Sequence, residues 1–100
     1  MVTLGLFARL EAKAGKEEEL AAFLLQGLKM AKQETTTPVW FAVRLSRSTF
    51  AIFDAFTDET GRQRHLGGPI AKALMEQAPH LLEAAPEIER VEVLGAKLPD

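Results

Sequence analysis

Two neighbouring segments that are apolar on both faces most constrain the fold of this chain. Residues 39–45 and 50–56 are rich in aromatic and β-branched side chains, and Ser46, Arg47 and Ser48 supply a turn between them, which predicts a β-hairpin. An antiparallel sheet that is backed by helices ordinarily leaves its other face polar. Because both faces of this hairpin are apolar, we expect a second copy of the chain to cover the face that helices leave open. The pattern therefore predicts a homodimer.

The periodicity of the remaining segments predicts an α+β fold. Residues 2–11 and 87–97 alternate as strands do, the second imperfectly, as at a sheet edge or a partner-facing position. Residues 16–32 place apolar side chains at helical spacing, with acids at the front. A second helical region follows the hairpin. The order β-α-β-β-α-β predicts a ferredoxin-like fold, in which helices cover one face of a four-stranded antiparallel sheet.

The second helical region is typical of a series of short helices. Thr57 is expected to cap the first helix, which carries the chain to His65 and ends at Gly67-Gly68. Pro69 can occupy the first position of the next helix. Residues 79–85 are expected to form a separate short turn or helix, because a proline opens them.

Composition excludes several classes of function. A chain of 100 residues is expected to form one domain over residues 1–100. It has no cysteine, which excludes disulfides, thiolate ligands and thiol nucleophiles, and its net charge of −2 gives no basic surface for nucleic acid. Its two histidines lack metal-ligand spacing, so no metal is expected. No apolar run reaches the ~20 residues of a membrane span and no signal-peptide pattern is present, which predicts a cytoplasmic protein without a membrane partner.

His65 is the candidate acid or base, because imidazole is the side chain whose ordinary pKa lies near neutrality. It lies where one helix ends and the next begins. The alternative is a structural role, in which a histidine at a helix C-terminus caps carbonyl groups and favours the negative end of the helix dipole.

Asp54 is the second candidate, because it is a lone carboxylate inside an apolar strand. A buried carboxylate must be paired, hydrogen-bonded or protonated. Either Asp54 faces a pocket, or it forms a structural ion pair with Arg44, the cation of the preceding strand. The ion pair is the favoured interpretation, although it depends on the register of the hairpin.

Three aromatic residues are candidates for substrate binding. Trp40 is the single tryptophan, and Phe53 and Phe56 follow on the next strand. Their rings could stack on a flat ligand, but large aromatic side chains on a buried sheet are more often part of a core or an interface.

The combination of these features resembles a known family. An aromatic strand with one central acid, an Asp58-Glu59 helix start and a His65-Leu66 pair before a short helix are similar to the antibiotic biosynthesis monooxygenase family. That family belongs to the dimeric α/β-barrel proteins, whose relatives include quinol monooxygenases and haem-degrading enzymes. The resemblance covers nearly the whole chain in element order, and it implies that the sheet pairs with a second copy as a dimeric α/β barrel.

The resemblance implies a cofactor-independent monooxygenase that acts on a phenolic or quinol-like substrate. His65 would take the substrate proton, and Trp40, Phe53 and Phe56 would line an apolar pocket. The chain departs from the family in lacking tyrosine, which family members often carry in the strand that Phe53 occupies. The haem-degrading branch is disfavoured, because Leu74 and Met75 stand where its histidine is expected. The alternative is a non-catalytic homodimer of the same fold, either a protein that binds a small ligand or a stress-related protein.

Overall fold

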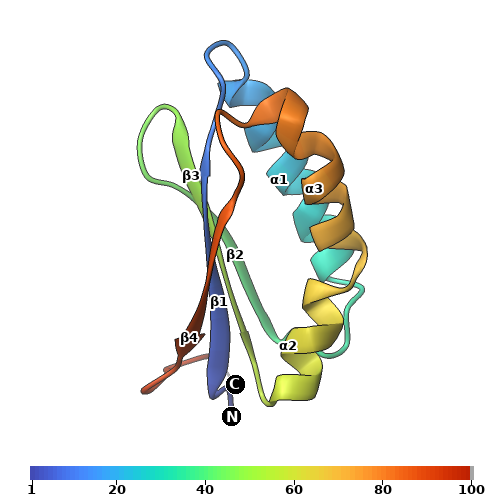
Figure 1. The fold of residues 1–100 in the computed structure, drawn as a ribbon. Helices are drawn as coiled ribbons and strands as arrows, with labels where there is room; N and C mark the ends of the chain where they lie inside the picture. The colour runs from blue at the N-terminus through green and yellow to red at the C-terminus, as the bar shows by residue number, and fades with distance from the viewer. Residues whose placement is uncertain (100) are drawn as a thin grey trace.

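The chain forms one four-stranded antiparallel sheet with its helices on one face, as Figure 1 shows for the computed structural model, which describes residues 1–99. The strands are β1 (Leu4–Glu11), β2 (Val39–Arg44), β3 (Thr49–Phe56) and β4 (Glu87–Glu92), in the sheet order β2-β3-β1-β4. The helices are α1 (Glu17–Ala31), α2 (Glu59–Leu66) and α3 (Pro69–Leu81). The predicted ferredoxin-like fold is confirmed, with its second helical region divided between α2 and α3.

The register of the sheet decides which side chains face the helices. Leu6 lies opposite Asp54, Ala8 opposite Ile52 and Leu10 opposite Phe50 in the β1–β3 pair, so the even-numbered residues share one face. This face packs against apolar side chains of α1 and α3, and burial of that apolar surface is the main force that holds the layers together. The core consists of Ala8, Leu10, Ala12, Leu20, Leu24, Phe50, Ile52, Leu74, Ala78, Leu81 and Leu82.

Within residues 1–99 no helix covers the opposite face of the sheet (Figure 1). This face carries aromatic side chains. Phe41 of β2 lies opposite Phe53 of β3, which in turn lies opposite Phe7 of β1. Phe41 is 54% exposed, whereas a smaller cluster that includes Val39 and Ala55 is buried at one end of this face. The expected apolar character of both faces is therefore present in the structure.

Most boundaries agree with the sequence prediction within two residues, and three features differ by more than a shifted end or in their cause. Asp58 rather than Thr57 caps α2, because its side chain accepts a hydrogen bond from the backbone N–H of Gly61. Pro79 does not begin a new helix but lies inside the last turn of α3, where its missing N–H removes a single hydrogen bond, the one to the carbonyl four residues earlier. The strand β4 ends at Glu92 instead of continuing to residue 97. None of the helices within residues 1–99 is both long and apolar enough to cross a membrane.

Candidate functional site

The short helix α2 holds His65 beneath the sheet. Asp58 fixes the start of α2, and one turn later Gly61 lets the helix approach the segment that follows α1. A methyl group at position 61 would lie 2.9 Å from the carbonyl oxygen of Thr36, a distance that real side chains do not adopt. Gly61 and His65 are four residues apart and share one face of the helix, so this close approach also brings the imidazole to the residues around Thr36.

The imidazole of His65 lies between two carboxylates. Its Nε2 is 2.8 Å from Oδ2 of Asp54 on β3, and its Nδ1 is 2.7 Å from Oε1 of Glu34 in the segment after α1. Thr37 donates its hydroxyl to the same Glu34 oxygen at 2.7 Å. The ring of His65 also packs against Phe56, with ring centroids 5.5 Å apart. Residues from β3, α2 and the segment after α1 therefore meet in one polar cluster inside an apolar interior.

The cluster is buried and its electrostatics favour a charged ring. Asp54 is 2% exposed and His65 is 6% exposed. Burial by itself would lower the pKa of His65, but the hydrogen bonds to Asp54 and Glu34 and the charges of these carboxylates outweigh it, so the pKa lies above its ordinary value. The geometry and the direction of the shift agree, because an imidazole that faces two carboxylates is stabilised as the cation.

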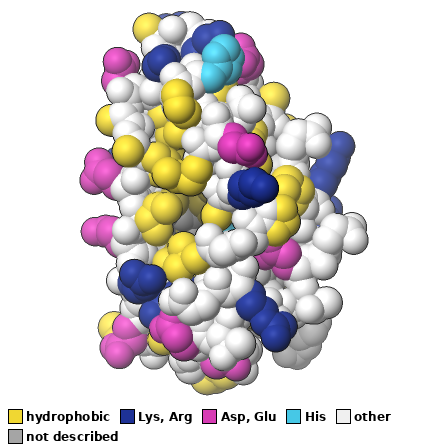
Figure 2. All heavy atoms as spheres, turned by 45° about the vertical axis from the view of Figure 1, so that its right-hand side comes forward, with side chains coloured by type: hydrophobic (Ala, Val, Ile, Leu, Met, Phe, Trp, Pro, Cys, Tyr) yellow, Lys and Arg dark blue, Asp and Glu magenta, His cyan; other side chains and the backbone are white. Residues whose placement is uncertain are grey.

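A narrow apolar cavity of about 40 Å³ adjoins Asp54 and His65. Its other lining side chains are all apolar and come from β1, β3, β4 and the second helical region: Leu6, Ala8, Ile52, Leu66, Ile70, Ala71, Leu74 and Ile88. Ile88 on the edge strand β4 is 44% exposed and stands at the rim. Leu66 and Ala71 also line a neighbouring surface hollow of about 280 Å³. Figure 2 shows hydrophobic side chains gathered around a hollow on this side of the molecule.

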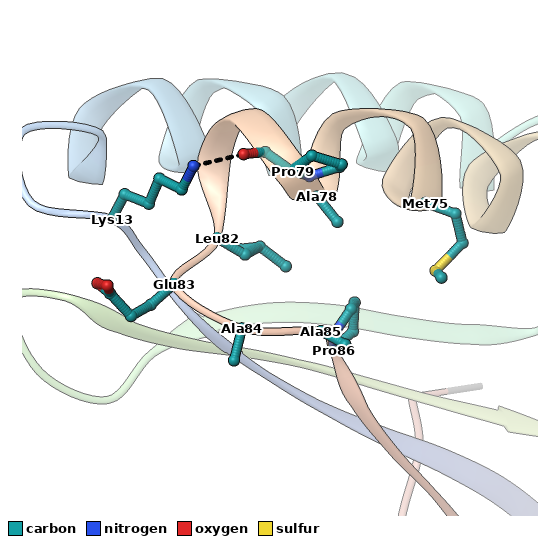
Figure 3. A pocket seen from close by; sticks show the side chains of 9 residues that line it. All are labelled: Lys13, Met75, Ala78, Pro79, Leu82, Glu83, Ala84, Ala85 and Pro86. Atoms are coloured by element: carbon teal, nitrogen blue, oxygen red, sulfur yellow. Dashed lines mark hydrogen bonds between the residues drawn. The ribbon is translucent and has the colours of Figure 1, made fainter.

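A larger groove of about 420 Å³ lies further along α3 (Figure 3). It is bounded by the end of α3 and the segment that leads to β4, with Lys13 donating a hydrogen bond to the carbonyl oxygen of Pro79 at one end and Met75 at the other. The charged side chains of its lining are Lys13 and Glu83. Neither His65 nor Asp54 lines this groove, so its size does not make it the site of acid–base chemistry.

Of the five predicted site residues, three lie together and two lie elsewhere. Asp54, Phe56 and His65 lie together on the helix side of the sheet. Trp40 lies on the same face directly opposite Asp54, but it packs into the core and its Nε1 has no hydrogen-bond partner among residues 1–99. Phe53 points to the open face, away from His65, because it neighbours Asp54 in the strand.

The favoured structural pairing of Asp54 with Arg44 is wrong. Trp40, not Arg44, lies opposite Asp54, and four strand residues place Arg44 roughly 13 Å further along β2. Arg44 instead donates to Oε2 of Glu18 at 2.9 Å and stacks over the ring of Phe50. His65, rather than Arg44, is the residue that pairs with Asp54.

Glu34 was missed by the sequence analysis. It lies in a polar stretch between α1 and β2, where a carboxylate is ordinarily solvated, and no periodicity marks it. Its role follows only from the folded structure, in which Thr37 donates a hydrogen bond to the same Glu34 oxygen that contacts His65. Within residues 1–99 no group of three or more potential ligand side chains is arranged to hold a metal ion. The two carboxylates of the cluster do not converge, because the imidazole lies between them.

Comparisons with known proteins identify relatives of this chain. No family model matches it, and no curated protein matches it. It is similar to the crystal structure of NE2512, a protein of unknown function from Nitrosomonas europaea, with 55% identity and a TM-score of 0.97 over 100% of this chain and 97% of that chain. It is also similar to PA3566 from Pseudomonas aeruginosa, at 18% identity and a TM-score of 0.80 over 95% of this chain and 97% of that one.

A third solved structure carries the name that the sequence resemblance suggested. It is described as a "putative antibiotic biosynthesis monooxygenase" from Deinococcus radiodurans, and it matches with 18% identity and a TM-score of 0.81. The match covers 97% of this chain and 98% of that chain. At this identity the likeness concerns the fold, and the ferredoxin-like fold of the single chain is confirmed.

Proposed function

We propose that this chain, which belongs to one family with the Nitrosomonas europaea protein NE2512 and has the fold of the antibiotic biosynthesis monooxygenases, is a cofactor-independent monooxygenase. Its substrate is a phenolic or quinol-like aromatic compound. The buried Asp54–His65 pair beside an apolar cavity is the observation that carries this proposal. A buried histidine with a raised pKa that is paired with a carboxylate beside an apolar cavity is a candidate active site on physical grounds.

The proposed reaction needs dioxygen and no further oxidant. With 1-naphthol as the probe, the cluster removes the hydroxyl proton, and the electron-rich ring then forms a carbon–oxygen bond to dioxygen at the carbon para to the hydroxyl. Cleavage of the oxygen–oxygen bond and loss of the para C–H proton give 1,4-naphthoquinone and water. The ring loses four electrons and the two oxygen atoms gain four, one atom entering the quinone and the other leaving as water. The protein supplies the base, the orientation and a dry environment.

The proposed enzyme is a homodimer. The open face of the sheet presents Phe7, Phe41 and Phe53 side by side across three strands, and Val43 on the same face is 40% exposed. Apolar side chains that cluster on an exposed face are typical of an interaction surface. A second copy of the chain covers them when two sheets pack face to face as a dimeric α/β barrel. Light scattering should then give twice the chain mass of 11.0 kDa.

A specific observation favours a second candidate, a non-catalytic homodimer that binds a small ligand. The cavity beside Asp54 has a volume of only about 40 Å³, which is less than an aromatic ring fills, so the substrate ring must extend into the neighbouring hollow. In this alternative the cluster of Asp54, His65 and Glu34 only stabilises the fold. The surface hollow next to the cavity binds a small apolar compound, and no reaction takes place.

Oxygen uptake separates the two candidates. Purified protein is mixed with 1-naphthol in air-saturated buffer, and oxygen consumption is followed together with the absorbance of the quinone. We expect one oxygen consumed per quinone formed, and a loss of turnover of roughly 10²-fold or more in His65→Ala. His80→Ala is the matched control, because His80 is exposed and pairs with Glu19 far from the cluster. Oxygen uptake no faster than in buffer, across a panel of uncharged naphthols and quinols, would favour the non-catalytic alternative.

A further inference from the structure

Both ring nitrogens of His65 are occupied by carboxylates, which limits what the ring can do. Nδ1 and Nε2 lie 2.7 and 2.8 Å from oxygens of Glu34 and Asp54, distances typical of hydrogen bonds between charged groups. A neutral imidazole carries a single N–H, so one of these contacts would set a lone pair against a carboxylate oxygen. An imidazolium donates to both. The geometry therefore favours the ring in its cationic form, and a ring in that form cannot accept a proton.

One of the two carboxylate oxygens of Asp54 makes no hydrogen bond to residues 1–99. Oδ2 of Asp54 accepts the hydrogen bond from His65, whereas Oδ1 is buried and has no hydrogen-bond partner among residues 1–99. A buried acceptor without a partner is costly to leave unsatisfied, so it calls for an explanation, of which a bound ligand or water molecule is one. Asp54 and His65 are the polar side chains in the lining of the apolar cavity. Asp54 lines the cavity and both ring nitrogens of His65 are occupied, so the unpartnered Oδ1 of Asp54 is the acceptor that we assign to a ligand hydroxyl.

The neighbouring groups restrict the ligand further. The titratable side chains that face the His65 ring are Asp54 from β3 and Glu34 from the segment after α1. Two carboxylates and one imidazolium leave the cluster with one net negative charge. In an apolar cavity this charge repels an anionic ligand strongly, because little solvent screens it. A hydroxyl group, in contrast, can donate to Oδ1 without bringing charge into the cavity.

We propose that Asp54 is the catalytic base, that His65 and Glu34 are positioning residues, and that the site selects an uncharged aromatic hydroxyl compound. This inference rests on the proposed function and deepens it. The substrate hydroxyl donates to Oδ1 of Asp54 and then transfers its proton to that oxygen, so that an O–H bond breaks on the substrate and forms on the carboxyl group. His65 holds the carboxylate by Oδ2, and Glu34 holds His65. The aromatic ring of the substrate packs against Leu66 and Ala71 and extends toward the surface hollow.

The protonation state of His65 is measured first, by ¹⁵N NMR of the histidine ring in the intact wild-type protein. Because His80 is the other histidine, His80→Ala assigns the signals. We expect both nitrogens of His65 to be protonated at pH 7, and both to lose this signature together only at higher pH. A neutral ring at pH 7 would overturn the assignment of Asp54 as the base, because His65 would then be free to take the proton.

Ligand selection is measured next, independently of turnover. The probes are 1-naphthol, naphthalene and 1-naphthoate, and binding is followed by NMR shifts of the methyl groups of Leu66 and Ala71. We expect 1-naphthol to bind at least ~10-fold more tightly than naphthalene, 1-naphthoate not to bind, and the preference for the hydroxyl to disappear in Asp54→Leu. Equal affinity for 1-naphthol and naphthalene overturns the inference. If the preference holds but no oxygen is consumed, the proposed oxygenase function fails and the recognition by Asp54 stands.

The pH profile of kcat/KM decides between the two bases if 1-naphthol is turned over. With Asp54 as the base and the His65 cation as its support, kcat/KM falls as the pH rises through the pKa of His65. With His65 as the base, kcat/KM rises through the same pKa.

We also expect Asp54→Asn to lose ~10²-fold or more in kcat with a much smaller change in KM, since an amide can accept a hydrogen bond from the hydroxyl but cannot take its proton. A rising profile, or an active and folded Asp54→Asn variant, would contradict the inference.

Discussion

The imidazole Nε2 of His65 lies 2.8 Å from Oδ2 of Asp54, although one residue belongs to a short polar helix and the other to a central strand. This pair joins α2 to the sheet, and Glu34 extends it to the segment that follows α1. These three side chains thus fix the position of the helix, and two of them, Asp54 and His65, form the polar end of an apolar cavity. Structure and candidate chemistry depend on one cluster, and variants of that cluster should affect both in separable ways.

The stability of the protein should fall as the pH rises above neutrality. The pKa of His65 is raised in the folded state, so the imidazolium pairing contributes stability fully below the ordinary value of about 6.5 and loses it as the pH rises through the folded value. A tenfold difference in proton affinity between the folded and unfolded states is equivalent to about 1.4 kcal/mol. Urea unfolding between pH 6 and 9 measures the effect. His65→Gln should remove the slope, while His80→Ala should keep it; a wild-type free energy of unfolding that is flat over this range would refute the ion-pair description.

Replacing Glu34 by Gln should lower the pKa of His65. The variant keeps an oxygen that accepts a hydrogen bond from Nδ1, but it removes one of the two negative charges that stabilise the imidazolium. Burial still disfavours the charged ring. An NMR titration of the histidine ring measures the change. The matched control is Glu19→Gln, which alters the exposed partner of His80 and should leave His65 untouched. A pKa of His65 that stays the same in both variants would show that Glu34 has no electrostatic role.

Gly61→Ala should destabilise the protein even though Gly61 lies in a helix. Alanine gains up to about 1 kcal/mol in helix propensity over glycine. The new methyl group, however, would lie 2.9 Å from the Thr36 backbone, and overpacking of this kind costs roughly 1–3 kcal/mol. The gain subtracted from the cost leaves an expected loss of up to about 2 kcal/mol, measured by urea unfolding. Gly95→Ala is the control, because a methyl group there meets nothing within 4 Å. Equal stability of the two variants would rule out close packing as the reason for Gly61.

Much of the fold followed from the sequence because it depends on periodicity. The strand alternation and the helical stripe of α1 are repeated over many residues, so a single exception does not hide them. The Asp54–His65 pair could be proposed only as two separate candidates, because the hairpin register that moves Arg44 away from Asp54 is set by tertiary pairing. Glu34 could not be found at all. Its role depends on the close approach of Gly61 to Thr36, a contact between segments that are distant in sequence.

A charged residue on the open face of the sheet should separate the proposed dimer. Phe41 is 54% exposed there, and Phe41→Asp places a charge where a second copy would bury it, at a high desolvation cost. Light scattering at micromolar concentration should change from twice the chain mass of 11.0 kDa to a single chain mass. Leu25→Asp is the control, because Leu25 is also strongly exposed but lies on α1, on the helix side. A wild-type monomer would contradict the dimer outright.

The most direct test of the Asp54 site is a crystal structure of the protein soaked with 1-naphthol under anaerobic conditions. We expect density for the ligand beside Asp54, with its hydroxyl oxygen about 2.5–2.7 Å from Oδ1 and its ring between the second helical region and the sheet. His65 should keep both of its contacts to Asp54 and Glu34. Density for the ring only in the large groove along α3, with the Asp54 cavity empty of ligand at saturating 1-naphthol, would refute the role of Asp54 in ligand binding.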